Sequence, residues 1–100
     1  MPGHAASVRV LEERESGAGW TFVVGVTGEP GEGERRVTVR IAWADYEYWA
    51  GGSRAPSRVA GAVVRFLLER DGLEALGDAF DAARVRRTHR DLDDVLPAML

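Results

Sequence analysis

Four arginines and three aspartates flank one of the two histidines of the chain, His89. The cations are Arg84, Arg86, Arg87 and Arg90, and the carboxylates that follow are Asp91, Asp93 and Asp94. Guanidinium groups this close together can bind phosphates, so a nucleic-acid or small-anion site is one interpretation. The other is that the cations stabilise the end of one helix and the carboxylates the start of the next. Because no aromatic residue is interleaved to stack bases and the carboxylates repel phosphate, nucleic-acid binding is kept as the alternative function.

Catalytic and metal chemistry have little support in the sequence. His89 and the aspartates after it could ligate a divalent cation, but one histidine beside arginines is a weak ligand set, and His4 is the only other histidine. None of the four serines lies in a nucleophile-elbow motif. The glycine-rich segment 28–33 carries two glutamates and no lysine, which predicts a hairpin loop rather than a phosphate loop. We therefore expect no catalytic residue, no metal and no cofactor, and a protein that is not an enzyme.

Aromatic residues are concentrated at 43–49, which holds Trp43, Tyr46, Tyr48 and Trp49. Partly exposed tyrosine and tryptophan suit a binding surface because they offer a large rigid area and one polar atom. On that interpretation Tyr46, Tyr48 and Trp49 contact a protein partner. The alternative is that all four aromatic side chains seal the join between sheet and helices, with Gly51-Gly52 ending a short helix. Local periodicity does not decide between the two.

The elements that position these residues divide the chain into a strand half and a helix half. Alternation of β-branched and polar residues predicts strands at about 7–14, 19–27 and 35–42. Gly17 and Gly19 predict one tight turn, and Pro30-Gly31 predicts another. Connections this short exclude a crossover helix, so the three strands should form an antiparallel meander.

Helical spacing of apolar residues follows. It predicts a short helix at about 43–50 and longer ones at about 56–70, 73–87 and 89–96. Pro56 suits a first helical turn, Asp71-Gly72 ends that helix, and Thr88 is a candidate N-cap for the last one. Pro97 should end or kink this last helix.

Composition limits the class of protein. The 100 residues make a single α+β domain spanning 1–100, with a three-stranded antiparallel sheet covered on one face by two or three helices. The absence of cysteine excludes disulfides and cysteine-based zinc sites, and the formal net charge of -3 does not favour a basic nucleic-acid clamp. No apolar run approaches the roughly 20 residues of a membrane span. All cations are arginine and residues 1–6 lack targeting features, which predicts a cytoplasmic protein from a GC-rich bacterial genome.

Three motifs follow one another along the chain: Asp45-Tyr46 followed by Gly51-Gly52, a Pro56-started helix containing Phe66-Leu67-Leu68-Glu69-Arg70, and Phe80-Asp81. With these motifs the chain resembles a group of short bacterial proteins with no known activity. Trp49-Ala50 departs from the aliphatic and hydroxyl residues usual there, and Ala55 replaces a hydroxyl residue at the N-cap. The resemblance covers roughly residues 45–96 and implies a fold without implying an activity.

Interaction with a protein partner or with a second copy is the predicted function. A three-stranded sheet has two edges that must be covered or blunted. One of its faces also carries a mixture of polar and apolar residues that could pair with another copy: Thr21, Val23, Thr27, Thr38, Arg40 and Ala42. The sequence leaves both a protein partner and a homodimer open.

Overall fold

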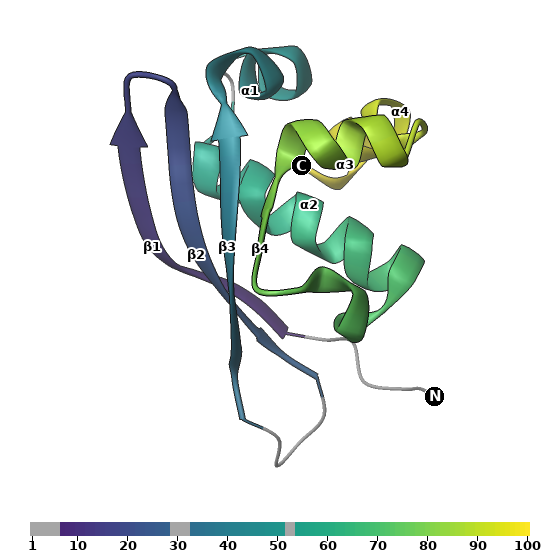
Figure 1. Ribbon diagram of the computed structural model, residues 1–100. Coiled ribbons are helices and arrows are strands. Elements are labelled where there is room, and N and C mark those ends of the chain that lie inside the picture. The colour runs from purple at the N-terminus through teal and green to yellow at the C-terminus, as the bar shows by residue number, and fades with distance from the viewer. Residues whose placement is uncertain (1–6, 29–32, 52–53) are drawn as a thin grey trace.

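The computed structural model describes residues 7–28, 33–51 and 54–100. The segments in which apolar and polar side chains alternate form an antiparallel meander. The strands are β1 (Ser7–Ser16), β2 (Gly19–Thr27) and β3 (Arg35–Ala42), in that order in the sheet (Figure 1). Their positions confirm the predicted strands, with β1 two residues longer. His4, the Pro30-Gly31 turn and Gly52 lie outside the described residues.

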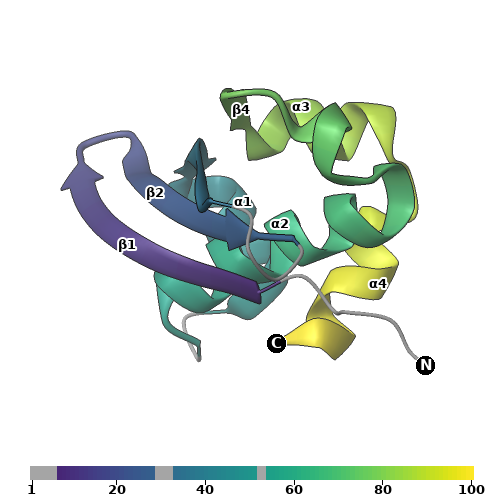
Figure 2. The same ribbon diagram turned by 90° about the horizontal axis from the view of Figure 1, so that it is seen from below.

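The edge strand β1 contains a bulge at Leu11. Val10 pairs with Val24 and Glu12 pairs with Val23, so Leu11 has no partner of its own on β2. A bulge bends its strand and increases the local twist. Figure 2 shows β1 curving along the sheet. The bend also makes this exposed edge a poor template for a further strand.

A fourth strand corrects the predicted three-stranded sheet. β4 (Ala79–Asp81) pairs with β3 in parallel, with Phe80 opposite Val39. The sequence predicted one helix over 73–87, because Leu73, Leu76 and Phe80 have helical spacing. The structure instead has a 3-10 turn, η1 (Leu73–Leu76), then β4, then α3 (Ala82–Thr88). The sheet is therefore mixed, and the helices between β3 and β4 supply the crossover that parallel pairing needs.

Helices α1 (Trp43–Ala50) and α2 (Pro56–Asp71) follow the prediction closely. Gly51 ends α1 in the left-handed conformation at φ 57°, and the N–H of Gly72 closes α2 on the carbonyls of Leu67 and Leu68. The last helix, α4 (Leu92–Met99), begins three residues later than predicted. Its N-cap position is Asp91, whereas Thr88 is the last residue of α3, so the predicted Thr88 cap is wrong.

The core lies between one face of the sheet and α2. The sheet contributes Trp20, Phe22, Val24, Val26, Val37, Val39 and Ile41. Helix α2 is buried almost all round from Val59 to Val64, because it contacts β1 and β2 and also α1 and α4. Its Ala60-Gly61-Ala62 segment presents little side-chain bulk to these neighbours. No helix in the described part of the chain is long and apolar enough to span a membrane.

Candidate interaction surface

None of the helices in residues 7–28, 33–51 and 54–100 lies over one face of the sheet. In Figure 1 α2 passes behind the long strands, and in Figure 2 α3 and α4 lie to one side of them. Along each strand, the residues between the core residues point to the side of the sheet away from α2. We call this set of residues the outer face. By strand register it consists of Ser7, Arg9, Glu12, Arg14, Thr21, Val23, Gly25, Thr27, Arg36, Thr38, Arg40, Ala42, Ala79 and Asp81.

The centre of the outer face is neutral and made of short side chains. Thr21 and Val23 on β2 lie beside Thr38 on β3, and all three are only half-buried. A groove of about 520 Å³ passes over Thr21 and Val23 and along the bulged part of β1 at Glu12 and Arg14. The outer face is therefore hollowed as well as uncovered.

Charges of both signs surround this centre. Arg14, Arg36 and Arg40 make no ion pair with any residue that the structure describes, and neither does Glu12. Arg9 binds Glu34 across the sheet, with 3.0 Å between guanidinium nitrogen and carboxylate oxygen.

Glycine at position 25 leaves room for the carboxylate of Glu34. A Cβ atom on Gly25 would come within 2.5 Å of Glu34 Oε2. This carboxylate therefore lies directly on the sheet, beside the guanidinium of Arg9.

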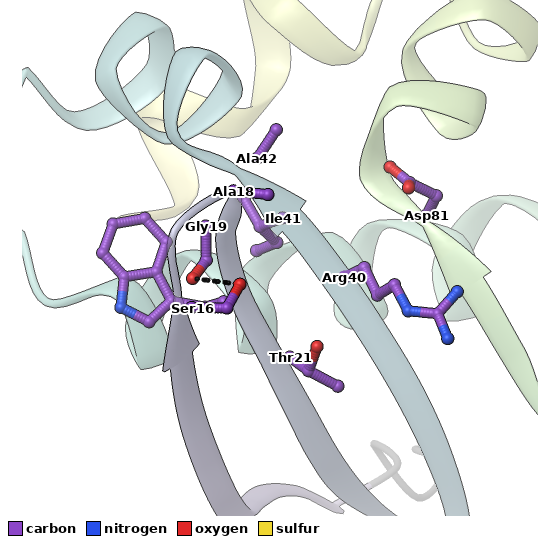
Figure 3. Close-up of a pocket in the computed structure, with 9 residues that line it drawn as sticks. Ser16, Ala18, Gly19, Thr21, Arg40, Ile41, Ala42 and Asp81 are labelled. Carbon is purple, nitrogen blue, oxygen red and sulfur yellow. Dashed lines mark hydrogen bonds between the residues drawn. The ribbon is translucent and has the colours of Figure 1, made fainter.

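A small depression marks one end of the outer face. Figure 3 shows Thr21, Arg40 and Asp81 on adjacent strands around it, with the β1–β2 turn above them. Its volume is about 130 Å³, below the roughly 300 Å³ at which ligand pockets begin. Asp81 is also committed to the fold, since its carboxylate accepts the N–H of Ala83 and caps α3. The depression is therefore a shallow feature of the outer face and is smaller than a ligand pocket.

Gly19 shapes this end of the sheet. It has φ of 147°, and a Cβ atom there would lie 2.2 Å from the carbonyl oxygen of Ile41. The close approach lets Ala18 accept a hydrogen bond from the N–H of Trp43 at 3.2 Å. The turn between β1 and β2 is thereby attached to the start of α1.

The predicted aromatic contact residues are mostly in the core. Tyr46 and Trp49 are only 7% and 5% exposed, whereas Tyr48 is 64% exposed. The Tyr46 hydroxyl donates to the carbonyl of Arg54, and Trp49 Nε1 donates to Asp93 Oδ1 at 2.8 Å. Trp43 packs on Trp20 with 4.1 Å between ring centroids. The prediction that Tyr46 and Trp49 form a contact surface is therefore wrong, and only Tyr48 keeps an accessible side chain.

Arg86 joins three helices, which removes it from the predicted anion site. Its Nη1 donates to Asp45 at 2.6 Å, and its Nε and Nη2 donate to the two oxygens of Asp93. The guanidinium also lies 4.7 Å from the ring centroid of Tyr48. The hydrogen bond to Asp93 raises the pKa of Arg86, and in return lowers the pKa of Asp93. Asp45 and Arg86 are 41 positions apart, so sequence spacing gave no sign of this pair.

The other three arginines of the cluster, Arg84, Arg87 and Arg90, are exposed. They make no ion pair within the part of the chain that is described. Asp91 binds Arg70 of α2 through both oxygens, and this hydrogen bonding lowers the pKa of Asp91. Two of the three carboxylates therefore link helices. Asp93 binds Arg86 of α3, and Asp91 binds Arg70 of α2.

His89 belongs to a hydrogen-bonded chain rather than to a metal site. Its Nε2 lies 2.7 Å from Asp71 Oδ2, and its Nδ1 lies 2.8 Å from Thr88 Oγ1. No group of three or more metal-ligating side chains occurs among residues 7–28, 33–51 and 54–100. Thr88 Oγ1 also lies within hydrogen-bond distance of the carbonyls of Arg84 and Val85, so it is tied to its own helix.

No protein-family model, no curated protein and no solved structure matches this chain.

Proposed function

We propose that the chain is a self-associating interaction module and that a second copy packs on the outer face. The observation that carries the proposal is the uncovered side of the sheet, whose centre at Thr21, Val23 and Thr38 is neutral and half-buried. A neutral centre surrounded by charged residues is the usual arrangement of a protein interface.

Self-complementarity favours a second copy over an unrelated partner. A two-fold interface uses the same patch on both subunits, so the patch must carry both members of each complementary pair. The outer face carries unpaired charges of both signs: Glu12 can bind an arginine of the second copy, because Arg14, Arg36 and Arg40 make no ion pair within the described chain. A patch of one sign would instead favour a partner of opposite charge.

The size of the outer face predicts a weak dimer. Three strands about 4.8 Å apart, with a rise of ~3.3 Å per residue, give a projected area of roughly 500 Å². Stable interfaces bury about 800 Å² on each partner. We therefore expect a dimer with a dissociation constant in the micromolar range or above, and exchange between monomer and dimer in solution.

Charge placed at the centre of the outer face tests the proposal. Val23→Glu should abolish the concentration-dependent dimer in sedimentation velocity, because two copies would then bring like charges together in a desolvated centre. Ala98→Glu, at an exposed position of α4, is the matched control and should dimerise like the unmodified chain. Circular dichroism would establish that both variants are folded. A monomeric unmodified chain at high concentration, or a Val23→Glu variant that still dimerises, would refute the proposal.

The cytoplasmic location predicted from the sequence is part of the same proposal. Fractionation of cells that produce the chain, followed by immunoblotting, should place it in the cytoplasmic fraction. Recovery in the membrane or secreted fraction would contradict it.

A further inference from the structure

A third concave region lies between the end of α2, η1, β4 and α3, and it meets the outer face only at Ala79. This pocket has a volume of about 460 Å³, within the usual range of about 300–1,000 Å³ for small-molecule sites. The buried side chains of Leu67, Leu76 and Val85 line it, together with the partly exposed ring of Phe80. Figure 1 shows the elements that surround it at the side of the molecule opposite β1.

The walls of the pocket are held in place by contacts on several elements. Arg35 of β3 donates to the carbonyls of Leu73 and Gly77, which fixes η1 and the turn after it. On the opposite wall, Asp71 holds His89 at 2.7 Å. The ring of His89 also packs edge-on against Phe66, with 5.6 Å between centroids. Two walls are therefore braced independently of any ligand.

Arg84 is the polar group on this pocket that the fold leaves unused. It lines the pocket from α3, is exposed, and makes no ion pair with the described residues. Two other polar side chains on the rim, Asp71 and His89, are hydrogen-bonded to each other. A guanidinium binds a carboxylate through two parallel hydrogen bonds, and the adjacent apolar surface can bury an organic body.

We propose that this pocket binds a small monocarboxylic acid with an apolar or aromatic body. The carboxylate lies on the guanidinium of Arg84, and the body packs on Leu67, Leu76 and Phe80. Asp71 on the rim disfavours ligands with two negative charges, such as phosphate monoesters, because its carboxylate would repel the second charge. The site meets the outer face only at Ala79 of β4, and its ligand contacts do not depend on the proposed self-association.

Nuclear magnetic resonance titration of the labelled full chain tests this proposal, with phenylacetate as the probe. Saturable amide shifts are expected at 73–80 and 84–89. Phenylethanol has the same ring without the charge and should bind about tenfold more weakly or worse. Arg84→Gln should weaken phenylacetate binding by a similar factor, whereas Arg87→Gln, another exposed arginine of α3 outside the pocket lining, should leave it unchanged.

A second variant tests the pocket rather than the charge. Ala75 lines the rim and is exposed, so Ala75→Phe should fill the opening without disturbing the core and should abolish the shifts. The proposal is overturned if phenylacetate gives no saturable shifts at these positions. It is also overturned if phenylethanol binds equally well, or if Arg84→Gln or Ala75→Phe binds as the unmodified chain does.

Discussion

At the scale of single residues, similar side chains close together in sequence have different roles. Tyr48 and Trp49 are neighbours, yet Tyr48 is exposed and Trp49 is buried against Asp93. Arg86 and Arg87 are neighbours too, yet Arg86 holds three helices together while Arg87 lies in solvent. The aromatic and arginine clusters are visible in the sequence, but partners 41 and 44 positions away decide which of their members are accessible. Local spacing carries no information on such contacts.

Replacing the two aromatic neighbours separately measures this difference. Trp49→Ala should lower the free energy of unfolding by about 3–5 kcal/mol, because it opens a cavity and removes a hydrogen bond to Asp93. Tyr48→Ala should lower it by less than about 1 kcal/mol, the loss of one exposed cation–π contact with Arg86. Urea unfolding followed by circular dichroism gives both values. Equal effects would contradict the placement of Trp49 in the core.

The pairing of Asp93 with Arg86 predicts how stability depends on pH. The pKa of Asp93 is lowered in the folded state. Its ionised carboxylate therefore adds to the free energy of unfolding at neutral pH, and this contribution is lost as the pH falls below about 4. Asp93→Asn should reduce stability at neutral pH and flatten the decline on the acid side. Asp94→Asn is the matched control, since Asp94 is the exposed neighbour and makes no ion pair with described residues. Urea unfolding midpoints measured across the acid range would show both effects. Identical plots of midpoint against pH for Asp93→Asn and Asp94→Asn would contradict the role of the Asp93–Arg86 pair.

At the scale of elements, the long strands and α2 were predictable and the segment 73–91 was not. Four alternating apolar positions identify β2 and three identify β3, whereas β1 has only Val8 and Val10 before its acidic residues. β4 has three residues, and only Phe80 among them is apolar and large. Its strand conformation comes from pairing with β3, including the Thr38 N–H donated to the carbonyl of Asp78 at 2.9 Å. A short segment whose structure depends on a distant neighbour has no signature of its own.

The turn between β1 and β2 gives a prediction at the same scale. Gly19→Ala should lower the free energy of unfolding by about 2 kcal/mol or more, because its φ of 147° is strained for alanine and the added Cβ would clash with the carbonyl of Ile41. Gly17→Ala is the control two positions earlier, where an added Cβ meets nothing within 4 Å. Thermal unfolding of both variants would separate them. A tolerated Gly19→Ala would contradict the close approach of this turn to β3.

At the scale of the whole molecule, the layers leave one face of the sheet uncovered. The helices of the described residues gather on the side of the core, with α2 between the sheet and α4, and none of them lies over the outer face (Figures 1 and 2). The mixed residues of this face were visible in the sequence. Their arrangement around a neutral centre depends on strand register and on the bulge at Leu11, which place Glu12 beside Val23.

Isotope-filtered nuclear Overhauser spectroscopy on an equal mixture of labelled and unlabelled chain tests the proposed interface most directly. The outer face carries its own probes, since Thr21, Val23, Thr38 and Ala79 all have methyl groups. Packing of a second copy on the outer face predicts intermolecular nuclear Overhauser effects from these methyls at concentrations where the dimer forms. Effects confined to Tyr48 and the ends of the helices, or none at all, would contradict it.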